Sequence, residues 1–268
     1  MPEQPSQQSK AETFRALHEG ETFVIPNPWD AGTAKALAAL GFKALATTSA
    51  GFAFTLGRLD GDVTLDEVME HVAVLAAATE LPVSVDMENG YGPEPEDAAL
   101  AVTRAAEAGA VGGSIEDWDA ERGIYGIEHA AERIAAAAEA AARVGFPFTL
   151  TARAENHIRK NPDLDDTIAR LQAYERAGAD VLYAPLVVKP EDIRAVCDAT
   201  SKPLNVLAVP GMTVSEIAAA GGRRISVGSQ LSTVATAAFA KAAEQIRDEG
   251  TFEALNVRVP LKEWLAGG

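Results

Sequence analysis

The sequence predicts an α/β protein built as a (β/α)8 barrel of the TIM type, and three observations support this fold. Short apolar runs rich in β-forming residues alternate eight times with Ala-rich amphipathic stretches. The first and last of these runs are about 200 residues apart, the span of a closed barrel. No Gly-x-Gly-x-x-Gly follows the first run, so the dinucleotide-binding form of an open doubly wound sheet is not indicated.

Eight segments are predicted as strands because they are short and nearly continuously apolar, which is typical of parallel strands covered on both faces. They are Phe23–Pro26, Ala44–Thr47, Val83–Asp86, Gly113–Ile115, Thr149–Ala152, Val181–Tyr183, Leu204–Leu207 and Ile225–Val227. No composition break interrupts the alternation. We therefore expect a single domain over 1–268, with a loose polar tail over 1–8.

The stretches between and after these strands have the amphipathic spacing of helices. They run from Ala11 to Gly20 and over Ala31–Leu40, Leu65–Thr79, Pro95–Ala108, Ile127–Val144, Leu164–Ala177, Pro190–Ala199, Val214–Ala220 and Leu231–Asp248. Pro95 and Pro190 stand at helix starts, where a missing backbone N–H is harmless. Gly41, Gly109 and Gly178 follow helix ends, where a left-handed residue is common.

Composition excludes several classes of protein. Asp and Glu number 39 against 23 Lys and Arg, and the resulting charge of −16 disfavours a nucleic-acid partner. A single cysteine rules out a disulfide framework and a cysteine-rich metal site. The polar start lacks the apolar core of a signal peptide, and no apolar run reaches the ~18 residues that cross a bilayer. We expect a cytoplasmic protein without a membrane partner.

Polar residues follow most of the predicted strands, at the end where barrel enzymes carry their active sites. They are Trp29 after the first strand, Ser49, Ala50, Gly51 and the loop residue Asp60 after the second, Asp86 and Glu88 after the third, Glu116 after the fourth, Arg153 and His157 after the fifth, and Asn205 on the seventh. The fold alone does not require this pattern.

Three of these residues form a candidate metal site. Asp86 and Glu88 are two residues apart, so an extended chain points both to one side, and Glu116 ends the next strand. A hard divalent cation would relieve their mutual repulsion, and an all-oxygen set without His or Cys favours Mg²⁺, with Mn²⁺ as the alternative ion. The competing interpretation is that these acids cap helices or pair with arginines.

The other candidates point to anion binding. Arg153 is a candidate clamp for a substrate carboxylate or oxyanion, or else the partner of a nearby acid such as Glu155 or Asp86. The small-residue turn Ser49-Ala50-Gly51 offers backbone N–H groups to an anion, or is a plain βα turn. His157 is the one histidine near this end and is a candidate substrate contact.

The motifs resemble those of the isocitrate lyase/phosphoenolpyruvate mutase superfamily, in particular its short members. They are Thr48-Ser49-Ala50-Gly51, Asp86-Met87-Glu88-Asn89-Gly90-Tyr91-Gly92, Ile115-Glu116-Asp117 and Thr151-Ala152-Arg153-Ala154-Glu155, in that order along the chain. The paired acids with Gly-Tyr-Gly are the most specific element. The resemblance covers roughly Phe23 to Gly228.

The resemblance implies a barrel whose last helix is swapped between paired subunits, with helices over about 229–268 serving subunit contacts in a dimer of dimers. It implies Mg²⁺ held by Asp86, Glu88 and Glu116, partly through water. A 2-oxo acid or enolate would chelate the ion, with Ser49, Gly51 and Arg153 holding its oxygens and Asp60 supporting the site. The shared chemistry is a pyruvate-like enolate formed beside a C–C or P–C bond.

The departures from the superfamily pattern reduce the number of candidate reactions. The lyases carry a Lys-x-Cys-Gly-His loop after the Glu-Asp pair, and here Trp118 to Gly126 contains neither Cys nor His. The mutases use a His after strand six, and here that strand runs into Ala184-Pro185. Glu88 also stands where the superfamily usually has Asp.

The retained parts suffice for decarboxylation of a small 2-oxo dicarboxylate such as oxaloacetate, which needs no dedicated acid. We therefore expect a Mg²⁺-dependent carbon–carbon lyase acting on 2-oxo or 2-hydroxy dicarboxylates. Three alternatives stay open: a lyase for another 2-hydroxy dicarboxylate with His157 or Tyr125 as the acid, P–C chemistry on a phosphonopyruvate-type substrate, and a non-catalytic binder of 2-oxo acids such as 2-oxoglutarate.

Overall fold

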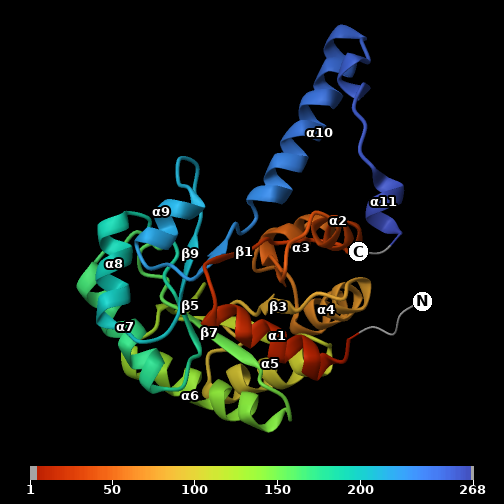
Figure 1. Cartoon of the computed structure of the whole chain (residues 1–268). Coiled ribbons are helices and arrows are strands. Elements are labelled where there is room, and N and C mark those ends of the chain that lie inside the picture. Colours follow the sequence, from red (N-terminus) through yellow and green to blue (C-terminus); the bar gives the residue numbers. More distant parts are fainter. Residues whose placement is uncertain (1–4, 267–268) are drawn as a thin grey trace.

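A computed structural model describes residues 5–266 and confirms the predicted barrel (Figure 1). Eight parallel strands form one sheet in the order β1-β10-β9-β8-β7-β4-β3-β2. Their bounds are β1 Phe23–Ile25, β2 Leu45–Ala46, β3 Val83–Asp86, β4 Gly112–Glu116, β7 Thr149–Arg153, β8 Val181–Tyr183, β9 Leu204–Leu207 and β10 Arg224–Ser226. The edge strands β1 and β2 are joined by a hydrogen bond from the Ala46 amide to the Pro26 carbonyl (3.1 Å), so the barrel is nearly closed.

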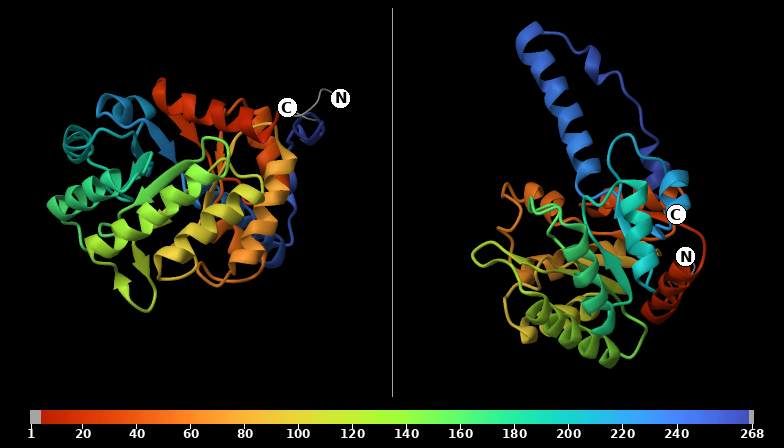
Figure 2. Two further views of the ribbon diagram at one scale, coloured as in Figure 1. Left: turned by 90° about the horizontal axis from the view of Figure 1, so that it is seen from below. Right: turned by 90° about the vertical axis from the view of Figure 1, so that its left-hand side faces the viewer.

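Most of the helices surround the sheet, whereas the long helix near the C-terminus leaves the barrel (Figure 2). Their bounds are α1 Gln7–Glu19, α2 Ala31–Ala39, α3 Ser49–Thr55, α4 Leu65–Ala78, α5 Pro95–Glu107, α6 Ile127–Arg143, α7 Leu164–Arg176, α8 Pro190–Ala199, α9 Val214–Ala219, α10 Gln230–Glu249 and α11 Leu261–Leu265. No helix among residues 5–266 is long and apolar enough to cross a membrane.

The local sequence explains where these helices begin and end. Asp30, Thr64 and Thr213 each accept a hydrogen bond from a backbone N–H of the first turn and complete a capping box at α2, α4 and α9. Gly109 and Gly178 take φ values of 100° and 106° after α5 and α7, the left-handed conformation expected there.

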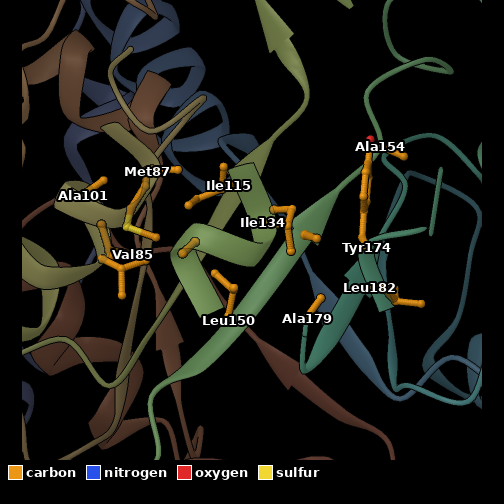
Figure 3. Close-up of a cluster of buried hydrophobic side chains, with 14 of the residues drawn as sticks. Val85, Met87, Ala101, Ile115, Ile134, Leu150, Ala154, Tyr174, Ala179 and Leu182 are labelled. Carbon is orange, nitrogen blue, oxygen red and sulfur yellow. The ribbon is translucent and has the colours of Figure 1, made fainter. Parts of the chain in front are cut away.

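The main apolar core lies between the strands and the surrounding helices (Figure 3). Val85, Leu150 and Leu182 of the sheet are buried against helix residues such as Ile134 and Tyr174. Many of the buried helix positions are alanine, including Ala101 of α5. Small side chains allow close approach of helix and sheet, which holds the strand ends in fixed positions.

Four local features differ from the sequence expectations. The turn predicted at Ser49 begins a seven-residue helix, α3, capped by the Thr48 side chain. The loop after β4 contains a two-stranded hairpin, β5 (Trp118–Asp119) with β6 (Gly123–Ile124). Helix α11 lies in the 229–268 region for which the resemblance implied helices, but its bounds were not predicted. Helix α1 includes positions 7 and 8 of the expected tail, while residues 1–4 lie outside the described part of the chain.

The C-terminal segment forms an arm that leaves the barrel (Figures 1 and 2). Helix α10 has twenty residues and buries only Ser232. After the short 3-10 turn η1 (Glu253–Leu255), the chain returns and α11 packs beside α2. Large apolar side chains on the arm are exposed, namely Val234, Phe239, Phe252, Leu255, Val257, Val259, Leu261 and Leu265.

Candidate active site

Strand register places five polar residues in one row across the barrel wall. Glu116 of β4 is aligned with Arg153 of β7, Arg153 with Tyr183 of β8, Tyr183 with Asn205 of β9, and Asn205 with Arg224 of β10. Aligned residues of neighbouring parallel strands direct their side chains to the same face of a sheet. The row therefore forms a polar band on one face.

A cavity of about 340 Å³ extends over this band at the carboxyl ends of the strands. Six predicted site residues line it, namely Ser49, Ala50, Asp60, Asp86, Arg153 and Asn205. Tyr183 and Arg224, which the sequence analysis did not single out, line it as well. The cavity is large enough for a small dicarboxylate.

Arg153 is the centre of the charged network. Its side chain is 13% exposed, and its guanidinium lies 2.8 Å from carboxylate oxygens of Asp86, Glu116 and Glu155. Burial disfavours its charge, but the three acids raise the pKa of Arg153 well above its ordinary value. Both ion pairs of the alternative interpretation, with Asp86 and with Glu155, are therefore present, and Arg153 also lines the cavity.

A second arginine follows on the loop after β7. Arg159 lies 3.4 Å from Glu116 and 3.3 Å from Glu155, and its guanidinium stacks 3.3 Å from the centre of the Trp118 ring. This stacking ties the β5–β6 hairpin to the acidic cluster. No sequence motif indicated the contact, because it joins residues from two separate loops.

The acids around the site outnumber these two arginines, and three of the acids have raised pKa values. Burial, with repulsion from Asp86 and Asp60, raises the pKa of Glu88 to about 7. Burial also raises the pKa of Glu116 well above its ordinary value, against the attraction of Arg153. Burial raises the pKa of Asp60 despite its hydrogen bond with Ser49.

This donor set fits a divalent cation such as Mg²⁺. All the groups are carboxylates, and a 2+ ion would stabilise their charged forms, which burial and, to a lesser degree, mutual repulsion disfavour. Within residues 5–266, no three Asp, Glu, His or Cys side chains lie close enough to hold an ion by themselves. Mg²⁺ accommodates such a set because it usually keeps several water ligands.

The turn after β2 contacts Asp86 directly. Ser49 Oγ donates to Asp86 Oδ2 at 3.0 Å, and the Ser49 amide lies 3.4 Å from the same oxygen. The Gly51 amide donates instead to its capping residue Thr48 at 3.3 Å, and Gly51 does not line the cavity. Of the three residues in the predicted anion turn, Ser49 and Ala50 thus face the site.

Some predicted residues lie away from the cavity. Glu116 ends β4 and Glu88 lies two residues after β3, but neither is among the lining residues. Trp29 is also outside the lining, and its carbonyl oxygen lies 3.0 Å from His71 Nε2. His157 is outside it too, and burial lowers its pKa against the attraction of Asp192 in α8 and Asp163 at the start of α7.

A buried arginine fixes the two acid-bearing loops. Arg133 of α6 donates to the carbonyls of Glu116 (3.3 Å), Gly92 (2.7 Å) and Asn89. Directly before Asn89, Glu88 adopts a left-handed φ of 48°. Arg133 was missed because nothing in the helical pattern of α6 distinguishes an inward-facing arginine from a surface one.

Comparisons with known proteins agree with this geometry. The family model for phosphoenolpyruvate phosphomutase matches residues 14–247. A crystal structure of a proposed lyase or mutase from Burkholderia cenocepacia is 50% identical, with a TM-score of 0.94 and 97% of each chain covered.

Two curated relatives carry named activities. A 2-methylisocitrate lyase of Halalkalibacterium halodurans is 31% identical over 268 residues, covering 94% of this chain and 87% of the lyase. An oxaloacetate decarboxylase of Rhodopseudomonas palustris is 32% identical over 179 residues, covering 63% of this chain and 59% of the decarboxylase. The chain belongs to the phosphoenolpyruvate phosphomutase family, within the isocitrate lyase/phosphoenolpyruvate mutase superfamily that its motifs predicted.

Proposed function

We propose that this protein is a Mg²⁺-dependent enzyme that decarboxylates a small 2-oxo dicarboxylate of the oxaloacetate type. The observation that carries the proposal is the composition of the cavity. Its lining combines Asp60, Asp86 and Arg153 with the Ser49 turn, and contains no His, Cys or Lys among the described residues. Such a site can polarise a 2-oxo acid and bind its oxygens without offering one of the usual acids for a carbon leaving group.

The ion would be held by Asp86, Glu88 and Glu116, partly through water. When bound, a divalent cation acts as a Lewis acid that polarises the 2-oxo group of the substrate. Ser49 holds Asp86 through its hydroxyl, and Asp60 is hydrogen-bonded with Ser49, so these two residues orient the central acid.

Arg153 and the backbone at the start of α3 would bind the carboxylate that remains. Arg153 already sits between acids and is held by them in a single orientation, which lowers the ordering cost of binding. Asn205, on the same row, donates to Ser226 at 2.9 Å and accepts from Arg224 at 2.8 Å, so its amide orientation is set before substrate arrives. Positioning of this kind places the bond to the leaving carboxylate for cleavage.

The alternative acids for a lyase mechanism are poorly placed. Tyr125 donates its hydroxyl to Asp119 at 3.3 Å within the hairpin loop and does not line the cavity. His157 lies outside it as well. Decarboxylation therefore remains the reaction that the described cavity supports best, and the named activity of the oxaloacetate decarboxylase relative supports the same assignment.

Oxaloacetate consumption and pyruvate formation test the proposal. Purified protein with Mg²⁺ should turn over oxaloacetate well above the rate of Mg²⁺ alone, and excess chelator should abolish the difference. Arg153→Ala and Glu116→Ala should each remove this metal-dependent rate. Arg143→Ala, which alters an exposed arginine paired with Glu139, serves as the matched control.

Two outcomes would contradict the proposal. Unchanged rates in Arg153→Ala would exclude the arrangement of groups described above. Saturable binding of 2-oxoglutarate or oxaloacetate without any turnover would favour the non-catalytic binder.

A further inference from the structure

Tyr183 occupies a position in the cavity that the proposed reaction has not yet used. It ends β8, lines the cavity, and is aligned with Arg153 on one side and Asn205 on the other. The guanidinium of Arg153 lies 5.4 Å from the centre of its ring. Its hydroxyl is hydrogen-bonded with Ser226, which also accepts from the Asn205 amide.

Loss of carbon dioxide from a 2-oxo dicarboxylate leaves an enolate whose terminal carbon must gain a proton. Among the described residues that line the cavity, the candidates are aliphatic hydroxyls, Asp60, Asp86, two arginines and one phenol. Aliphatic hydroxyls are very weak acids. Three acids raise the pKa of Arg153. Burial lowers the pKa of Arg224 to about 10, but its N–H groups donate to Asn205 and Thr151. Asp60 and Asp86 are both hydrogen-bonded with Ser49, and Asp86 also pairs with Arg153. The phenol of Tyr183 is the remaining group.

We propose that Tyr183 is the general acid that protonates the enolate carbon. This inference rests on the proposed function. The bond to the leaving carboxylate breaks, its electron pair moves into the enolate, and carbon dioxide departs. The Tyr183 O–H proton then passes to the terminal carbon as the C2 carbonyl re-forms, and the tyrosinate regains a proton from water in the cavity.

The surroundings of Tyr183 support this role in both protonation states. Burial raises its pKa to about 12, so the phenol carries its proton at neutral pH. After transfer, the negative charge lies beside two arginines, Arg153 over the ring and Arg224 further along the row.

The surroundings of Arg224 suit it to stabilise the tyrosinate that forms after proton transfer. It is 5% exposed and donates to Asn205 (2.8 Å) and to Thr151 (3.0 Å), and its Nη1 lies 3.4 Å from His18. No carboxylate among the described residues forms an ion pair with it within 4.0 Å. A buried cation without a carboxylate partner favours a transient anion nearby.

Exchange of the pyruvate methyl protons in D₂O tests the proposal in the reverse direction. Enzyme and Mg²⁺ should speed deuterium incorporation into pyruvate, followed by proton NMR. Tyr183→Phe removes only the hydroxyl and should slow this exchange by about 100-fold or more, the usual contribution of a general acid or base. Tyr125→Phe is the matched variant, since it removes a phenol outside the cavity, and should exchange like the wild type.

Two further measurements make the result decisive. Oxalate binding by calorimetry should be similar in Tyr183→Phe and wild type, which shows that the site is folded. Ser226→Ala, which removes the hydrogen-bond partner of the phenol, should reduce exchange by a smaller factor. Exchange at the wild-type rate in Tyr183→Phe, or absence of exchange in the wild type, would overturn the proposal.

The assay also separates this inference from the proposed function. If Tyr183→Phe loses exchange but the wild type does not consume oxaloacetate, the assignment of Tyr183 as the general acid stands and oxaloacetate is not the substrate. If the wild type consumes oxaloacetate and Tyr183→Phe exchanges normally, the decarboxylase stands and Tyr183 is not its acid.

Discussion

Arg133 shows how one buried side chain can support a site that it does not touch. It is 1% exposed, and it donates to two backbone carbonyls in the loop after β3 and to one at the end of β4. Its guanidinium lies 4.9 Å from the centre of the Tyr125 ring. Buried carbonyl groups that lose their donor are left unsatisfied, which costs more than the hydrogen bond itself is worth.

Replacing Arg133 by Met should therefore lower the free energy of unfolding by about 2–4 kcal/mol, because three carbonyls lose their donor. Denaturant titration measures the change. Arg143→Met, at an exposed position of the same helix, should stay close to wild type. Equal effects of the two substitutions would show that the contacts of Arg133 contribute little.

Glu88 makes the stability of the folded protein depend on pH. Its pKa is about 7 in the folded protein against 4.5 for an ordinary Glu, chiefly because of burial. The folded state thus binds a proton that the unfolded state has already lost between these values, so the stability of the metal-free protein should fall as pH rises from about 4.5 to about 7.

Thermal unfolding across this range, with chelator present, checks the Glu88 prediction. Glu88→Gln should flatten the dependence, because an amide does not titrate. Added Mg²⁺ should restore stability at the upper end of the range. A fall of the same size in Glu88→Gln would assign the effect to other acids.

At the scale of elements, the loop between β3 and α5 is the most constrained segment of the site. Glu88, Gly90 and Tyr91 all have positive φ values, of 48°, 82° and 62°. A Cβ atom on Gly90 would lie 3.0 Å from the Ala98 backbone. The loop is thus wound tightly against α5, and within it the Tyr91 hydroxyl lies 3.5 Å from Oε1 of Glu88.

Gly90→Ala should lower both stability and metal-dependent turnover, since the added methyl group forces the loop away from α5. Gly123→Ala is the matched control: Gly123 has a similar φ of 76°, but nothing lies within 4 Å of its Cβ position. Comparing the two variants by thermal unfolding separates close packing from backbone strain. A loss in Gly123→Ala as large as in Gly90→Ala would contradict the packing argument.

At the scale of the whole molecule, the C-terminal arm exposes large apolar side chains that the rest of the described chain does not cover. Its exposed apolar side chains include Phe239 at 73% and Val257 at 76% exposure. Exposed apolar surface of this kind marks an interaction site. The swapped helix and the dimer of dimers implied by the sequence resemblance remain a prediction, and this arm is where we expect those contacts.

Phe239→Glu should therefore shift the protein from a tetramer to a smaller species, measured by size-exclusion chromatography with light scattering. Leu100→Glu, an equally drastic change at a half-exposed position on α5, should leave the assembly intact. A monomeric wild type would contradict the predicted assembly.

Much of the fold could be predicted because its signals are local. Three of the eight barrel strands, including Val83–Asp86, have the predicted bounds, and the others differ by one residue at one or both ends. Apolar runs, capping residues and glycines after helices each act within a few positions. Helix α3 was missed because its short apolar stretch follows a turn-like Ser-Ala-Gly sequence.

The sequence also predicted that the acids, Arg153 and the Ser49 turn belong to the site, because the carboxyl ends of barrel strands meet at one face. The sequence could not show that Arg153 stands among three acids or that Tyr183 shares a cavity with Asp86. Those facts depend on register between strands far apart in the chain. Local patterns decide which residues can form a strand, whereas packing of the whole barrel decides which side chains meet.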